Sequence, residues 1–99
     1  MANVWTHGTW TVKPGREREF VDAWLTLARE ASAELAPPEP PTLLRDRERP
    51  NVFVSFGPWQ DDEAVERFRS SDAFRAAQQT IRDLLESFEP RTFDEMSHG

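Results

Sequence analysis

The sequence lacks several residue types that carry common chemistry. Its 99 residues include no cysteine and no tyrosine, only two histidines, and a single lysine against eleven arginines. Without cysteine, disulfide bonds and thiolate catalysis are excluded. His7 and His98 stand far apart in the chain, which argues against a dedicated metal site. The excess of arginine over lysine is typical of a GC-rich bacterial genome.

Positive charge and long apolar runs are also scarce. The net charge of −6 argues against nucleic acid as a partner, because phosphate binding needs a basic surface, and equally against an anionic membrane. No apolar run approaches the ~20 residues of a membrane span. The opening MANVWTHG has no basic segment followed by an apolar one, so no secretory signal is expected. We therefore expect a cytoplasmic protein of one domain with a modest core.

Hydrophobic periodicity predicts the elements of the first half. Residues 3–12 are rich in β-branched and aromatic side chains and predict a strand. Residues 16–35 predict an amphipathic helix, whose apolar positions are Phe20, Trp24, Leu27, Ala31 and Leu35. The proline-rich run APPEPP at 36–41 predicts a stiff, extended connector. Residues 42–48 and 52–56 predict two strands that are close enough to form a hairpin.

The second half predicts two helices and a last strand. Asp61 or Asp62 is expected to cap a short helix that ends near residue 70, and Ser71 or Asp72 to cap the next. An apolar stripe carries that helix to Phe88, before Pro90 ends it, and 91–96 form the last strand. The order β-α-β-β-α-β predicts an α+β, ferredoxin-like fold. Its antiparallel four-stranded sheet has the first and third strands in the centre and the helices on one face.

Side-chain parity divides each central strand into two faces. The residues expected to face the helices are Val4, Thr6, Gly8, Trp10, Val12, Phe53, Ser55, Gly57 and Trp59. The residues expected on the other face are Trp5, His7, Val52, Val54 and Phe56. An apolar sheet face that its own helices do not cover marks an interface. We therefore expect a homodimer with sheet packed against sheet.

Two segments resemble the antibiotic biosynthesis monooxygenase family: TVKPGREREFVDAW at 11–24 and LLRDRERPNVFVSFGPWQDDEAVERFRSSDAFRAA at 43–77. The resemblance covers about residues 4–96 as a single domain and leaves 97–99 as a C-terminal tail. It implies a dimeric α+β barrel. The family includes oxygenases that oxidise aromatic polyketides without metal or flavin, and haem-degrading enzymes. The resemblance thus specifies the fold more closely than the reaction.

Comparison with the two enzymatic branches narrows the expected chemistry. The Asn, Trp and His of the haem-degrading branch align with Gly8, Phe68 and Gln78, so an axial iron ligand is missing and haem degradation is not expected. The Asn, Trp and Tyr of the polyketide-oxidising branch align with Ser55, Trp59 and Val65. The resemblance therefore implies a cofactor-free site in which Ser55 can still donate a hydrogen bond and Val65 cannot.

We expect a pocket between the sheet and the helices. Small residues at 8, 55 and 57 lie under bulky helix residues, and a close-packed interior tolerates a void only when a ligand or water fills it. The expected substrate-binding residues are Trp10, Trp24, Ser55, Trp59, Phe68, Phe74 and Gln78. Alternatively, these rings simply fill the space, and Trp59 is a packing plug at the end of its strand.

The candidates for catalysis are Ser55, Trp59 and His7. His7 has a pKa suited to proton abstraction near neutrality, but its parity places it on the dimer side unless the register shifts by one residue. The predicted function is a cofactor-independent monooxygenase that oxidises an aromatic or polyketide-like small molecule with molecular oxygen. Such chemistry needs an apolar cage, a donor to the oxyanion and a base. The alternative is a non-catalytic binding or structural dimer of the same fold.

Overall fold

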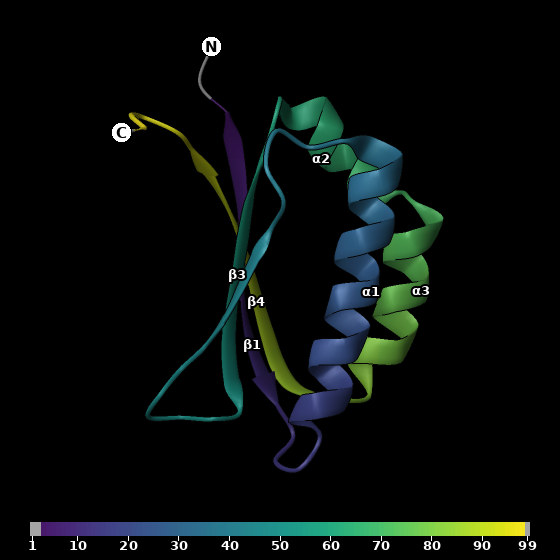
Figure 1. Cartoon of the computed structure of the whole chain (residues 1–99), viewed down its shortest axis with the longest axis vertical. Helices are drawn as coiled ribbons and strands as arrows, with labels where there is room; N and C mark the ends of the chain where they lie inside the picture. The colour runs from purple at the N-terminus through teal and green to yellow at the C-terminus, as the bar shows by residue number, and fades with distance from the viewer. Residues whose placement is uncertain (1–2, 99) are drawn as a thin grey trace.

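The computed structural model describes residues 3–98, so Met1, Ala2 and Gly99, the last residue of the expected tail, lie outside the described part. The elements are β1 (Val4–Val12), α1 (Glu17–Leu35), β2 (Thr42–Arg45), β3 (Val52–Trp59), α2 (Asp62–Arg69), α3 (Asp72–Arg82) and β4 (Leu85–Asp94). The antiparallel sheet has the order β2-β3-β1-β4, and the helices lie on one side of it (Figure 1). The predicted α+β, ferredoxin-like fold is confirmed.

The helices begin where the local chemistry predicts. The turn before α1 contains Gly15, whose φ of +92° is left-handed and suits glycine. Asp61 caps α2 by accepting a hydrogen bond from the main-chain nitrogen of Ala64 at 2.8 Å, and Ser71 caps α3 through Phe74 at 3.1 Å. None of the helices within residues 3–98 combines the length and apolar character needed to cross a membrane.

The hairpin of β2 and β3 is present, although β2 is shorter than expected. It ends at Arg45 rather than residue 48, because Asp46 folds the chain into a turn. The Asp46 carboxylate accepts hydrogen bonds from the main-chain nitrogens of Glu48 and Arg49 at 2.8 and 3.1 Å. These two donors lower the pKa of Asp46. At the other end β3 continues beyond the expected residue 56 to Trp59.

The prediction that the last helix continues to Phe88 was wrong. Helix α3 ends at Arg82, and β4 starts at Leu85 rather than at residue 91. The apolar stripe fits a helix, but its last residues are buried for other reasons. Leu84 is buried in the turn, where its carbonyl accepts a hydrogen bond from the main-chain nitrogen of Lys13. Phe88 pairs with Trp10 across the sheet. Pro90 therefore lies within a strand, which β4 tolerates because it is at the edge of the sheet.

The core lies between the sheet and the helices in two clusters. The larger joins α1, α3 and the sheet through Val12, Phe20, Trp24, Phe53, Ile81 and Leu84. The smaller packs α2 against the end of β3 through Trp59, Ala64 and Val65. Because each cluster fills one end of the space between the layers, the region between them is where a cavity can remain.

The helices leave the other face of the sheet uncovered (Figure 1), and aromatic side chains lie on that face. Trp5 and His7 contact rings on neighbouring strands: Trp5 lies 6.4 Å from Phe56 and His7 lies 5.7 Å from Phe93, measured between ring centroids. Phe93 is 48% exposed. This is the face on which sequence parity placed the dimer interface, and dimerisation stays a prediction.

We expect Val54→Asp to split or unfold the dimer, because it would place an unpaired charge at the centre of the interface. Sedimentation at micromolar concentration should give about 23 kDa for the unmodified protein, twice the chain mass of 11.5 kDa. Leu25→Asp is the matched control, since Leu25 lies on α1 and is already 44% exposed. An unmodified protein that sediments as one chain would contradict the prediction.

Candidate functional site

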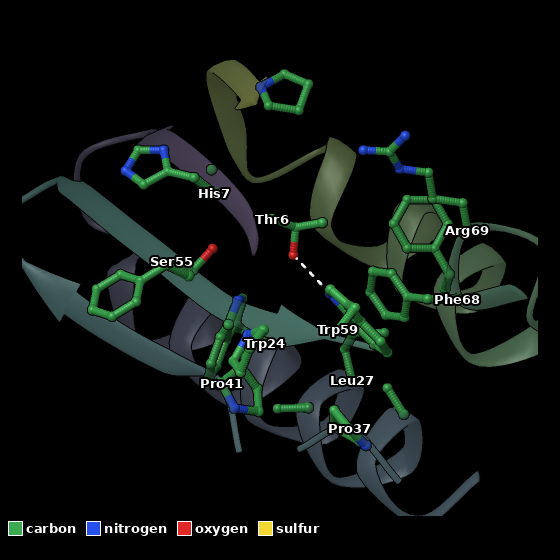
Figure 2. Close-up of a pocket in the computed structure, with 18 of the residues that line it drawn as sticks. Thr6, His7, Trp24, Leu27, Pro37, Pro41, Ser55, Trp59, Phe68 and Arg69 are labelled. Carbon is green, nitrogen blue, oxygen red and sulfur yellow. Dashed lines mark hydrogen bonds between the residues drawn. The ribbon is translucent and has the colours of Figure 1, made fainter. Parts of the chain in front are cut away.

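A cavity of about 500 Å³ lies between the sheet, the helices and the proline-rich connector (Figure 2). This volume is within the range of small-molecule sites. All seven residues predicted to bind substrate line it: Trp10, Trp24, Ser55, Trp59, Phe68, Phe74 and Gln78. A second hollow of about 350 Å³ adjoins it along α3 and shares Trp10, Phe74 and Gln78. That these residues bind a substrate stays a prediction.

Aromatic rings form the wall of the cavity near α2. Trp59 lies 4.9 Å from Phe68, and Phe68 lies 5.0 Å from Phe74 in an edge-to-face contact, both between ring centroids. Three elements thus bring the rings together: Trp59 closes β3, Phe68 belongs to α2 and Phe74 to α3. Trp59 is 93% buried, since only 7% of it is exposed, and it packs against Ala64 and Val65. It therefore plugs the strand end and also lines the cavity.

Two tryptophan indoles donate hydrogen bonds to hydroxyl groups across β1 and β3. Trp10 Nε1 donates to Ser55 Oγ and Trp59 Nε1 donates to Thr6 Oγ1, each at 2.9 Å (Figure 2 shows the second). A hydroxyl has one proton to donate besides its acceptor sites. Within residues 3–98 neither hydroxyl proton has an acceptor in the protein, so both are available to a ligand.

The small size of Gly8 and Gly57 was expected to leave empty space. In the structure, neighbouring groups pack closely against both glycines instead. A Cβ on Gly8 would come within 2.8 Å of Phe88 Cε1, and a Cβ on Gly57 within 3.2 Å of Pro41 Cα. The Phe88 ring stacks on Trp10 with 4.0 Å between centroids and 23° between planes. Glycine at position 8 therefore allows this stack to form beside the Ser55 hydroxyl.

Neither position 7 nor position 65 places an ionisable side chain in the cavity. His7 borders the cavity, but its position opposite Phe56 and its contact with Phe93 direct the imidazole to the other face of the sheet (Figure 2). Its Nδ1 is buried and has no hydrogen-bond partner within the described residues. Val65 is 4% exposed in the apolar core beside Trp59. The strand register deduced from parity is thus the observed one.

Sequence reasoning missed several residues of the cavity wall: Thr6, Pro37, Pro41, Arg69, Phe88 and Thr92. The two prolines belong to the segment that was expected to be only a connector. The alternation of side chains along β1 had placed Thr6 on the helix-facing side, and this was the signal that could have identified it as a cavity residue. Nothing in the local sequence indicates that Arg69 reaches Thr92 on β4, where its Nη2 lies 3.4 Å from Thr92 Oγ1.

Gly8→Ala should lower the free energy of unfolding by about 0.5–1.5 kcal/mol, the size of one aromatic pair, because the new methyl separates Phe88 from Trp10. In a chain that already carries Phe88→Leu, the same change should cost less, since no ring edge is in the way. Urea unfolding of the two single variants and the double variant gives the coupling between the sites. Equal costs in both backgrounds would contradict this assignment.

The family model described as antibiotic biosynthesis monooxygenase matches residues 41–80, which include β2, β3, α2 and most of α3. No curated protein matches the sequence.

Solved structures match over nearly the whole chain. SnoaB, a cofactor-independent oxygenase from Streptomyces nogalater solved as a mutant, is 25% identical with a TM-score of 0.85, over 97% of this chain and 95% of that chain. A protein of Caulobacter crescentus CB15, provisionally named an antibiotic biosynthesis monooxygenase, is 18% identical with a TM-score of 0.89, over 97% and 92%. A protein from Pseudomonas aeruginosa is 22% identical with a TM-score of 0.85, over 98% and 97%. The chain is therefore similar to the antibiotic biosynthesis monooxygenase family, in sequence over residues 41–80 and in fold over nearly its whole length.

Proposed function

We propose that the protein is a cofactor-independent monooxygenase that oxidises an aromatic or polyketide-like small molecule in the cavity. The observation that carries the proposal is the pair of indole-bound hydroxyls, Ser55 and Thr6, which keep their protons free at an aromatic-walled cavity. The match of residues 41–80 to the family model and the similarity to SnoaB, which is a cofactor-independent oxygenase, support it.

The reaction needs no external reductant when the substrate supplies all the electrons. An activated ring methylene loses a proton, and the carbanion passes one electron to oxygen to give a substrate radical and superoxide. These combine to form a C–O bond, and protonation gives a hydroperoxide. Loss of the second carbon-bound proton with cleavage of the O–O bond leaves a ketone and releases water. One oxygen atom thus enters the product and the other leaves as water.

The protein would favour the first step by stabilising the anion. When an anthrone-like substrate is deprotonated, the negative charge spreads to its carbonyl oxygen, where the Ser55 or the Thr6 hydroxyl can donate a hydrogen bond. Donors that favour the charged form lower the pKa of the substrate, so less base is needed to remove its proton. The rings of Trp59, Phe68 and Phe74 would hold the ring system and exclude water.

A second candidate is a non-catalytic binding protein of the same fold. The position of His7 favours it, because the imidazole suited to act as a base near neutral pH faces away from the cavity. The apolar Val65 at the position expected to hold a tyrosine points the same way. In this alternative, an aromatic ligand enters the cavity and leaves unchanged.

Oxygen consumption with a panel of anthrones and hydroquinones tests the first candidate. We expect uptake above a heat-denatured control, and Ser55→Ala should lower kcat by roughly tenfold or more because one donor to the oxyanion is lost. Ser70→Ala is the matched control, since Ser70 is exposed at the end of α2. Absence of uptake across the panel would contradict the monooxygenase.

Trp59→Ala separates the two candidates. If the protein only binds ligands, an aromatic ketone should quench tryptophan fluorescence of the unmodified protein without forming product, and Trp59→Ala should weaken that binding. Turnover that disappears in Trp59→Ala or Ser55→Ala, while circular dichroism remains unchanged, would exclude the binding-only alternative.

A further inference from the structure

One corner of the cavity is polar, in contrast to its aromatic wall. Thr6 on β1 and Thr92 on β4 are directly paired in the sheet register, so their side chains are neighbours on the helix-facing side. Arg69 at the end of α2 reaches this pair, with Nη2 3.4 Å from Thr92 Oγ1. Figure 2 shows the Arg69 guanidinium above Phe68 on the side of the cavity where Thr6 lies. All three residues line the cavity.

The guanidinium in this corner lacks an anionic partner. None of the ion pairs formed within residues 3–98 includes Arg69. By contrast, Arg67 on the same helix is 3.2 Å from Glu63, and Arg91 on β4 is 3.3 Å from Glu89. The Thr6 hydroxyl accepts from Trp59 and keeps its own proton, so it adds a second kind of donor to the corner.

The charge of the cavity wall also differs from that of the chain. Among the described residues that line the cavity, Arg91 is already paired with Glu89, so Arg69 is the cation left without an anionic partner and Glu39 is the one acidic residue, whereas the whole chain carries a net charge of −6. An anion therefore meets a locally favourable site on a protein that would otherwise repel it. Arginine presents its donors as a planar fork that matches the two oxygens of a carboxylate.

We propose that the corner formed by Thr6, Arg69 and Thr92 binds a carboxylate, so that the ligand of the cavity is an aromatic carboxylic acid. The carboxylate accepts hydrogen bonds from the Arg69 guanidinium and the Thr6 hydroxyl, and its rings pack on Trp59 and Phe68. The proposal deepens the proposed function and rests on it only in placing the substrate in this cavity.

The sheet register also sets where the rest of such a ligand lies. Ser55 is paired with Gly8, which is two residues from Thr6 along β1, a separation of roughly 7 Å. With the carboxylate at the corner, an oxygen bound to Ser55 is then on the opposite edge of a ring system of two or three fused rings. A single ring is too small to reach both donors.

Calorimetric titration with 2-naphthoate and 2-naphthamide tests the proposal at neutral pH. The two probes have nearly the same shape, and only the acid is charged. We expect the unmodified protein to bind the acid roughly tenfold more tightly or better, because its hydrogen bonds are charge-assisted. Added salt should reduce this preference, since the corner is partly open to solvent.

Arg69→Gln should abolish the preference for the acid, and Arg67→Gln, on the same helix and already paired with Glu63, should retain it. Arg69→Lys keeps the positive charge but lacks the planar guanidinium, so it should retain part of the preference for the acid. This variant separates loss of the anion site from loss of the fold. Three results would overturn the proposal. The unmodified protein could bind acid and amide equally well, or bind neither probe at millimolar concentration. Alternatively, the two glutamine variants could lose the preference for the acid to the same extent.

Oxygen uptake, measured separately, distinguishes this proposal from the function on which it rests. If the protein prefers the acid through Arg69 but consumes no oxygen with any substrate of the panel, the monooxygenase proposal is rejected and the carboxylate site stands. If oxygen uptake is as fast with neutral aromatic substrates as with matched acids, and is unchanged in Arg69→Gln, the carboxylate site is rejected and the monooxygenase proposal stands.

Discussion

The pairing register of β1 with β3 is the constraint on which the rest of the structure depends. It sets Gly8 opposite Ser55 and Thr6 opposite Gly57, and two indole-to-hydroxyl hydrogen bonds cross the same pair of strands. A shift of one residue would move every side chain of one strand to the other face. The cavity would then lose one hydroxyl and one tryptophan, and both indole-to-hydroxyl hydrogen bonds would break. The same register gives the far side of the sheet its apolar surface, so the site and the expected interface have one origin.

The site combines an apolar wall with a few fixed donors, and each part comes from a different element. The helices supply Trp24, Phe68 and Phe74, while the central strands supply the hydroxyls. Because each indole already occupies one acceptor position of its hydroxyl, the direction in which the proton can point is restricted before a ligand arrives. Such preorganised donors are most effective where water is excluded. With serine and valine at the positions that depart from the family pattern, the proposed reaction would rely on binding geometry more than on a protein base.

Local periodicity was enough to predict the faces of the central strands, because alternation along a strand is a property of neighbouring residues. It was not enough at the end of α3, where Leu84, Leu85 and Phe88 fit both a helical stripe and a strand, and only the pairing of Phe88 with Trp10 decides. The partners of Thr6 and Gly57 were equally hidden. Thr6 meets Trp59 across 53 residues of sequence, and Gly57 meets Pro41 on a connector whose path no local signal specifies. Contacts of this range follow from the folded sheet and not from composition or spacing.

The central claim is that an indole-bound hydroxyl, that of Ser55 or that of Thr6, donates a hydrogen bond to an oxygen of a bound aromatic molecule. A crystal structure of the protein soaked with an aromatic ketone such as anthraquinone tests it most directly. The account predicts the ketone oxygen within about 2.7–3.2 Å of Ser55 Oγ or Thr6 Oγ1, with the rings against Trp59 and Phe68. A ligand bound outside the cavity, or one inside it whose oxygen approaches neither hydroxyl, would contradict the account.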